Sequence, residues 1–187
     1  MPPDHELRSR NRLDDAEKLR SRPAASGDAA AIAEIYNQGI EDRIATLDTQ
    51  PRSAGEIERL LTARAGRYPA IVVERGGQVI GFAWTAEYRQ REAYVGVAEF
   101  SVYVARSARS QGAGRVALEA LITAAEAAGF WKLVSRIFVD NQASRRLCLA
   151  LGFREVGIYR RHGRLDGRWM DCVIVERLLG PAAHDPA

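Results

Sequence analysis

The chain has 187 residues, 47% of them hydrophobic, and a formal net charge of +3. This length and composition suit one domain with a hydrophobic core. The arginines are dispersed and do not form the clustered basic surface that a nucleic-acid binder needs. Two cysteines and three histidines without metal-ligand spacing argue against a zinc site and a disulfide framework. No apolar run has membrane-spanning length, and the charged N-terminus is unlike a signal peptide, so we expect a cytoplasmic protein that binds no membrane, nucleic acid or metal.

The domain is predicted to span residues 19–180, between two tails. Residues 1–18 are charged and carry few large apolar side chains, so we expect a flexible tail or a frayed helix. Residues 181–187 have a similar character and are predicted as a C-terminal tail. No internal repeat occurs in the sequence between them.

The first part of the domain is predicted to contain a short strand and two helices. Leu19–Arg22 is predicted as an edge strand. Ser26 or Asp28 is expected to cap a helix, because apolar side chains then recur at helical spacing, at Ile32, Ile35, Tyr36 and Ile40. Ser53 is the predicted N-cap of a second helix, which ends at Gly66.

A hairpin, a long strand and a third helix follow. Two apolar runs flank Gly76-Gly77, which accept the positive φ angles of a type I′ turn. The segment Tyr94–Val104 is predicted as one strand. The helix after it is expected to end at Gly129 and to bury one apolar face, formed by Leu118, Leu121, Ile122 and Ala125.

The last part of the domain is predicted as a strand, a helix and a second hairpin. The strand is "KLVSRIFV", the helix "NQASRRLCLALGF" ends at Gly152, and Asp166-Gly167 turns the hairpin. The resulting order, β-α-α-β-β-β-α-β-α-β-β, places hairpins on both sides of a central β-α-β unit. The sequence therefore predicts an α/β fold with a mixed antiparallel and parallel sheet and helices on both faces.

The stretch "RSQGAGR", from Arg109 to Arg115, predicts an anion site where a strand gives way to a helix. Glycines let the backbone approach a ligand, successive N–H groups point at its oxygens, and the helix dipole favours negative charge. The loop also fits the dinucleotide fingerprint. However, seven residues separate Val104 from Gly112, whereas a dinucleotide fold places its first glycine almost directly after the strand. The lysine of a nucleoside-triphosphate loop is missing.

This strand–R-x-x-G-x-G–helix unit resembles the pyrophosphate-binding motif of the GNAT acyltransferases, which bind acetyl-CoA. Four further segments resemble, in order, the phosphinothricin N-acetyltransferase branch, and within it the arsinothricin-resistance enzymes: "AIAEIYNQGIEDRIAT", "YRQREAYVGVAEFSVYV", "NQASRRLCLALGF" and "GRLDGRWMDCVIVERLL". The likeness runs from about residue 19 to residue 179. It implies the GNAT acyl-CoA N-acyltransferase fold, acetyl-CoA as cosubstrate and a homodimer. A glycine turn that merely begins a helix is the alternative for the loop alone.

The resemblance also implies how the coenzyme is held. Backbone groups near Val102 and Val104 would pair with the pantetheine arm. Arg109 precedes the N–H groups that would hold the pyrophosphate, those of Gln111, Gly112, Ala113, Gly114 and Arg115. Asn141 matches a pantetheine-binding position, and Ser144 lies one turn further on. Helix capping is the alternative for both residues.

Glu99 is the candidate general base. It lies in an otherwise apolar strand, on the same alternating face as Val97 and Ser101. A carboxylate buried there is costly unless it is paired or its pKa is raised, and a raised pKa suits a general base. The resemblance implies this role, directly or through water. A salt bridge to an inward arginine is the alternative.

Arg89 and Arg91 are the candidates for binding the acceptor substrate. Arginine recognises planar or tetrahedral oxyanions through paired, charge-assisted N–H bonds. The resemblance implies that these arginines hold the carboxylate and the phosphinate or arsinate of the acceptor, and solvated loop arginines are the alternative. Tyr36 and Asn37 are predicted to line the same pocket, although Tyr36 also fits a core position on its apolar helix face.

Two features depart from the family pattern. Cys148 stands where many GNAT enzymes carry a tyrosine that protonates the coenzyme thiolate. Packing is the preferred interpretation of this cysteine, and water or another hydroxyl would then supply the proton. Leu47 and Asp48 stand where an aromatic residue and a glutamate are usual, which leaves the exact acceptor open. His162 is predicted as a surface residue of the second hairpin, which could reach a neighbouring subunit.

The sequence therefore predicts an acetyl-CoA-dependent N-acetyltransferase that modifies the α-amino group of a small acidic amino-acid analogue. Phosphinothricin, arsinothricin and methionine sulfoximine represent the class, and detoxification would be the result. Acetylation of a protein N-terminus or another amine is the second possibility, because a sequence cannot exclude an open peptide groove. A non-catalytic coenzyme-binding sensor is the third, and Glu99 argues against it.

Overall fold

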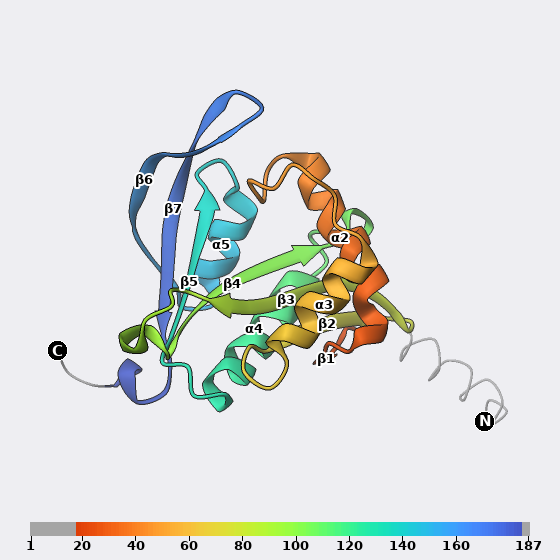
Figure 1. Cartoon of the computed structure of the whole chain (residues 1–187), viewed down its shortest axis with the longest axis horizontal. Helices are drawn as coiled ribbons and strands as arrows, with labels where there is room; N and C mark the ends of the chain where they lie inside the picture. The colour runs from red at the N-terminus through yellow and green to blue at the C-terminus, as the bar shows by residue number, and fades with distance from the viewer. Residues whose placement is uncertain (1–17, 185–187) are drawn as a thin grey trace, which may run out of the picture.

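A single sheet organises the chain, and the computed structural model describes residues 18–184. The strands are β1 (Arg20–Pro23), β2 (Ala70–Arg75), β3 (Gln78–Glu87), β4 (Val97–Val104), β5 (Lys132–Phe138), β6 (Arg154–Leu165) and β7 (Arg168–Leu178). Their order across the sheet is β1-β2-β3-β4-β5-β7-β6 (Figure 1). Apart from its last residue, the tail predicted over residues 1–18 lies outside the described residues, as do residues 185–187 of the predicted C-terminal tail.

Helices connect the strands within the described residues. The α-helices are α2 (Ala29–Asp42), α3 (Ala54–Arg64), α4 (Ala113–Ala127) and α5 (Gln142–Ala150). The short 3₁₀ turns are η1 (Ser26–Asp28), η2 (Glu92–Tyr94), η3 (Arg106–Ala108) and η4 (Gly180–Ala183). Between residues 18 and 184, no helix is both long and apolar enough to cross a membrane, and no group of three or more His, Cys, Asp or Glu side chains is arranged to hold a metal ion.

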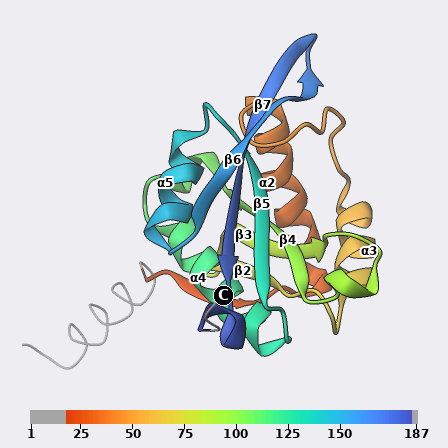
Figure 2. The same cartoon turned by 90° about the vertical axis from the view of Figure 1, so that its left-hand side faces the viewer.

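The sheet is mixed, with helices on both faces. β4 and β5 run parallel, and the other neighbouring strands of the sheet are antiparallel. Helices α2 and α3 cover one face, and α4 and α5 the other (Figure 2). Side chains of β4 alternate between these layers: Ala98 and Phe100 pack with α4, and Tyr103 packs with α2. The predicted fold class and order of elements are confirmed.

Local sequence signals explain the turns and one helix start. Gly76-Gly77 has φ angles of 58° and 79°, and Asp166-Gly167 has 47° and 79°, as type I′ turns require. The Ser53 hydroxyl accepts a hydrogen bond from the Glu56 N–H, and the Glu56 carboxylate accepts one from the Ser53 N–H at 2.7 Å. This reciprocal capping box fixes the start of α3. The two predicted hairpin turns and the Ser53 cap are therefore confirmed.

One predicted cap and two boundaries differ in part from the sequence-based expectation. Asp28, one of the two predicted candidates, is the N-cap residue of α2, but its carboxylate makes no capping hydrogen bond to α2 and accepts the N–H of Ala25 at 2.8 Å, which caps η1. β4 begins at Val97 and not three residues earlier, because Glu92–Tyr94 form η2. Gly180–Ala183 form η4 at the start of the predicted C-terminal tail. None of these shifts changes the arrangement of the sheet.

Candidate active site

The parallel strands β4 and β5 pair only over the first three residues of each strand and then separate. Their pairing ends at Glu99, and Figure 1 shows the two strands running apart beyond their shared end. On the other side of β4, the N–H of Ala105 donates to the carbonyl of Ile80 in β3 at 2.9 Å. Backbone groups of successive strand residues point to opposite neighbours. The N–H and C=O groups of Val102 and Val104 therefore face the gap between β4 and β5.

The N-terminus of α4 lies beside this gap. Gly112 is its N-cap with a φ of 89°, and no side chain caps the helix, so its first-turn N–H groups can serve an anion. A Cβ on Gly114 would lie 3.5 Å from Val104 and 3.4 Å from Leu147 of α5. The space enclosed here, which we call the coenzyme cavity, measures about 520 Å³. Its lining includes eight of the ten residues predicted to bind the coenzyme: Val102, Val104, Arg109, Gly112, Gly114, Arg115, Asn141 and Ser144.

The other two predicted coenzyme residues do not line this cavity with their side chains. Ala113 is buried in the core between α4 and the sheet. The side-chain oxygen of Gln111 accepts a hydrogen bond from Arg75 of β2, and its amide nitrogen donates to the carbonyl of Ser107 at 2.8 Å. These contacts hold the loop in place, so any contact of Gln111 or Ala113 with a ligand would come from the backbone.

The guanidinium of Arg109 lines the coenzyme cavity but already has partners. Its Nε donates to the carbonyl of Val104 at 3.2 Å, and its Nη2 pairs with Oδ2 of Asp42 in α2 at 2.6 Å. Arg106 contacts Oδ1 of the same aspartate at 2.7 Å. The two arginines therefore tie the glycine loop to α2, and Arg109 has a structural role whether or not it also contacts the coenzyme.

Asn141 caps α5 and links it to the loop after α2. Its Oδ1 accepts the N–H of Ser144 at 3.1 Å, and its Nδ2 donates to the carbonyl of Ile44 at 3.1 Å. The capping alternative is therefore confirmed for Asn141. Both Asn141 and Ser144 also line the coenzyme cavity, and their contacts with a coenzyme stay a prediction.

Cys148 lies where α5 packs against the diverging strands. The residue is 2% exposed and belongs to the core that includes α4. Its side chain also lines a cavity of about 60 Å³, together with Ser101 and Ser135. Burial raises the pKa of the Cys148 thiol to about 12. The thiol therefore stays protonated at neutral pH, and this position suits the predicted packing role and not a nucleophile.

Glu99 projects from β4 at the point where its pairing with β5 ends. The residue is partly buried, and Arg136 of β5 forms an ion pair with it. Burial raises the pKa of the Glu99 carboxyl above its ordinary value, although the charges of Arg136 and His162 act in the opposite direction. The two outcomes expected for a buried carboxylate, a raised pKa and an arginine partner, therefore occur together.

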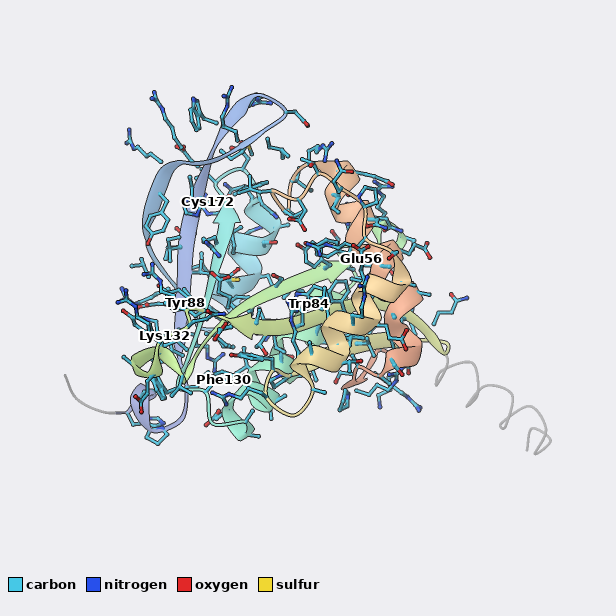
Figure 3. All side chains as sticks on the ribbon, in the orientation of Figure 1. Glu56, Trp84, Tyr88, Phe130, Lys132 and Cys172 are labelled. Carbon is cyan, nitrogen blue, oxygen red and sulfur yellow. The ribbon has the colours of Figure 1, made fainter. Side chains whose placement is uncertain are left out.

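Two further cavities meet at Tyr36, Glu99 and Ser101. The hairpin cavity measures about 270 Å³ and extends toward the loop after α2 and the β6–β7 hairpin, with Asp48, Arg136, His162 and Cys172 in its wall. The α3 cavity measures about 220 Å³ and extends toward α3 and β3, with Arg52, Leu60, Arg64, Trp84 and Ala86 in its wall. Figure 3 labels Cys172 and Trp84, one from each wall. The hairpin cavity shares Ser101 and Ser135 with the small cavity beside Cys148, and so lies next to the gap between β4 and β5.

Tyr36 and Asn37 occupy different positions. Tyr36 lines both the hairpin cavity and the α3 cavity, donates its hydroxyl to Asp48 at 2.8 Å and is also part of the core. Asn37 lines neither cavity. Its amide donates to the carbonyl of Arg52 at 2.9 Å and accepts the N–H of Arg52 at 2.8 Å. Asn37 therefore positions the chain that carries Arg52, whose guanidinium pairs with Asp48 at 2.8 Å.

Arg89 and Arg91 are exposed in the loop between β3 and β4, and neither lines the hairpin cavity or the α3 cavity. The arginines in those walls are three that were not predicted from sequence: Arg52, Arg64 and Arg136. Arg64 had a signal, because it follows Ile57 by seven residues and Leu60 by four, and so continues the apolar stripe of α3. His162 is exposed, as predicted, but also lines the hairpin cavity.

Known proteins resemble the chain over most of its length. Residues 22–174 match the family model of the acetyltransferase (GNAT) domain. The chain is 35% identical to a phosphinothricin N-acetyltransferase of Streptomyces viridochromogenes, over 83% of this chain and 85% of that protein. It is 33% identical to an L-methionine sulfoximine/L-methionine sulfone acetyltransferase of Pseudomonas paraeruginosa, over 88% of this chain and 97% of that protein. The crystal structure of a phosphinothricin acetyltransferase from Sinorhizobium meliloti in complex with acetyl-CoA has a TM-score of 0.84 at 31% identity, and the match covers 90% of this chain and 92% of that one.

Proposed function

Because the chain belongs to the GNAT acetyltransferase family, we propose that it transfers the acetyl group of acetyl-CoA to the α-amino group of a small acidic amino-acid analogue. Phosphinothricin, arsinothricin and methionine sulfoximine represent this class, and N-acetylation would detoxify them. The relatives named for phosphinothricin and methionine sulfoximine support the choice of substrate. The position of Glu99 carries the proposal, because this carboxylate lies between the strand gap and two cavities that could take the acceptor. These are the hairpin cavity and the α3 cavity, which we call the acceptor-side cavities.

The residues around the strand gap fit a coenzyme A group. An uncapped helix N-terminus suits a pyrophosphate. The outward backbone groups of Val102 and Val104 suit the amides of a pantetheine arm, which can hydrogen-bond to β4 as a further strand would. Asn141 and Ser144 line the other side of the same cavity. The thioester end of such a coenzyme would lie near Ser101, next to Glu99.

Glu99 would accept a proton from the acceptor ammonium, directly or through one water. A raised pKa makes this carboxylate a stronger base than an exposed glutamate. The freed amine then forms a bond to the thioester carbonyl carbon, its nitrogen releases the surplus proton to water, the C–S bond breaks, and coenzyme A leaves as a thiolate. With its pKa at about 12, the Cys148 thiol is a weak acid, so water or a hydroxyl group would protonate the thiolate.

Arginines would hold the anionic end of the acceptor. The family resemblance assigns this role to Arg89 and Arg91, which are exposed near the start of β4. A charge-assisted pair with a carboxylate or phosphinate is the contact that arginine makes best. Replacing either with alanine is expected to raise the KM for an acidic amino acid and to leave the affinity for acetyl-CoA unchanged.

A homodimer in the cytoplasm completes the proposal. Exposed apolar side chains gather on the β6–β7 hairpin and support a second subunit there: Val156, Ile158, Tyr159 and Trp169. Sedimentation analysis of the purified chain would measure the oligomeric state. A monomer at all concentrations would contradict this part of the proposal without affecting the chemistry.

A thiol-release assay with acetyl-CoA tests the function. The acceptors are phosphinothricin, arsinothricin, methionine sulfoximine, a polyamine and a peptide with a free N-terminus. We expect coenzyme release only with the amino-acid analogues, and mass spectrometry should find the acetyl group on their α-nitrogen. Release with the peptide alone would favour the protein N-terminal acetyltransferase. Binding of acetyl-CoA in calorimetry without release for any acceptor would favour a non-catalytic sensor.

A further inference from the structure

Arg64, the last residue of α3, lines the α3 cavity, which Glu99 also lines. The guanidinium carbon lies 4.8 Å from the centroid of the Trp84 ring, in a cation–π contact. Its Nη1 is buried and has no hydrogen-bond partner among residues 18–184. Within the same residues, no carboxylate forms an ion pair with Arg64. Arg64 therefore has an unpaired buried donor, and the same residue lines the α3 cavity.

The other two arginines of the acceptor side already have partners. Arg52 pairs with Asp48 at 2.8 Å, and Arg136 pairs with Glu99. Burial lowers the pKa of Arg64, which reflects the cost of keeping its charge away from water. Arginine nevertheless remains protonated in proteins. Arg64 is partly buried, and a charge in such a position without a carboxylate partner is costly to the fold, a cost that an anionic ligand would offset.

The sheet register places Trp84, which Arg64 covers, two residues along the sheet from Glu99, a separation that one small amino acid can span. Trp84 is paired with Ser101, and Ala86 is paired with Glu99, so these residues share the face that α3 covers. Two residues along a strand correspond to roughly 6.6 Å. A small amino acid with its ammonium at Glu99 would therefore extend its anionic group toward the guanidinium over Trp84.

We propose that Arg64 binds the anionic group of the acceptor in the α3 cavity and thereby sets the preference for acidic amino-acid analogues. This inference rests on the proposed function. It assigns the arginine that contacts the acceptor's anionic group inside the cavity to α3, and not to the exposed loop that carries Arg89 and Arg91. Arg64 acts on binding and takes no part in proton transfer. The ligand class is a compact anion on an amino-acid side chain or backbone: carboxylate, phosphinate or arsinate.

The kinetic test compares Arg64→Met with Arg59→Met. Methionine keeps the apolar contact with Trp84 and removes the charge. Arg59 lies on the same helix, is exposed, and donates to the carbonyl of Gly55 at 3.2 Å. Loss of a charge-assisted contact should raise the KM for phosphinothricin by about 10- to 100-fold in Arg64→Met, with kcat and the KM for acetyl-CoA close to wild type. Arg59→Met should behave as wild type, and an unchanged acceptor KM in Arg64→Met would overturn the inference.

Thermal unfolding without any coenzyme gives a second readout that does not depend on catalysis. Inorganic phosphate should raise the Tm of the wild-type chain and of Arg59→Met by the same amount, and should have a much smaller effect on Arg64→Met. In the absence of phosphate, Arg64→Met should melt at or above the wild-type temperature, because it removes a partly buried charge that has no carboxylate partner among residues 18–184. An equal phosphate effect in all three proteins would show that the anion binds elsewhere. If the wild-type chain acetylates no acceptor, the proposed function fails, whereas the phosphate measurement still decides whether Arg64 forms an anion site.

Discussion

Arg136 forms an ion pair with Glu99 at the point where β4 and β5 separate. Burial raises the pKa of the Glu99 carboxyl, and the neighbouring Arg136 lowers it. Without the arginine, burial would be opposed only by the smaller effect of His162 and would favour the protonated acid. Arg136 therefore keeps Glu99 available as a base at neutral pH, while burial keeps it stronger than an exposed glutamate.

Activity should depend on the deprotonated form of Glu99. Because its pKa is raised, kcat/KM is expected to fall as the pH drops through that raised value, at a higher pH than an exposed glutamate would give. Arg136→Met removes the opposing charge, so the pKa of Glu99 should rise further and the acidic limb of the profile should move to higher pH. A pH profile of kcat/KM for both proteins measures the shift. An acidic limb at the same pH in the two proteins would contradict the coupling between Arg136 and Glu99.

Glu99→Gln is expected to lower kcat by about 10²- to 10⁴-fold, the usual contribution of a general base. Glutamine has nearly the same shape and can still accept a hydrogen bond from Arg136, so the fold and the affinity for acetyl-CoA should be unchanged. A thiol-release assay measures kcat, and calorimetry measures the affinity for acetyl-CoA. Near-normal turnover at neutral pH would remove Glu99 as the base.

The sequence was sufficient for the fold and for the strand-to-helix loop, because those signals are local. Paired turn glycines, the Ser53 cap and the spacing between Val104 and Gly112 each act within a few residues. Glu99 was also predictable, because it is a charged residue between apolar residues of the same strand. These features need no information about distant parts of the chain.

The arginines of the acceptor side were not predictable in the same way. Arg52, Arg64 and Arg136 belong to a loop, a helix and a strand that meet only when the sheet is assembled. In sequence, Arg136 looks like an ordinary strand residue. Arg64 continues the apolar stripe of α3, but nothing near it in the chain indicates the cavity that it lines. The family resemblance implied that Arg89 and Arg91, just before β4, hold the acceptor, yet they line neither acceptor-side cavity.

Gly112→Ala is expected to weaken acetyl-CoA binding by about tenfold or more, because the strained cap would turn the first N–H groups of α4 away from the pyrophosphate. The φ of 89° at Gly112 lies in the left-handed region, where a side chain costs about 1–2 kcal/mol. Gly77→Ala is the matched control, since Gly77 has a φ of 79° and no heavy atom within 4 Å of an added Cβ. Both variants should lose a similar amount of unfolding free energy, and only Gly112→Ala should lose coenzyme affinity in calorimetry. Equal affinities in the two variants would place the pyrophosphate elsewhere.

Cys148 is expected to contribute packing and no proton. Its pKa of about 12 makes the thiol a poor acid at neutral pH, and its 2% exposure places it in the core. Cys148→Ala should therefore lower the free energy of unfolding by about 1 kcal/mol and leave kcat close to wild type. Cys148→Ser separates the two roles, because serine restores a hydroxyl donor but buries a polar group in an apolar site. If Cys148 only packs, Cys148→Ser is the less stable of the two variants, and both variants turn over normally. If kcat falls by about 10²-fold or more in Cys148→Ala and is restored in Cys148→Ser, the residue donates the proton to the thiolate.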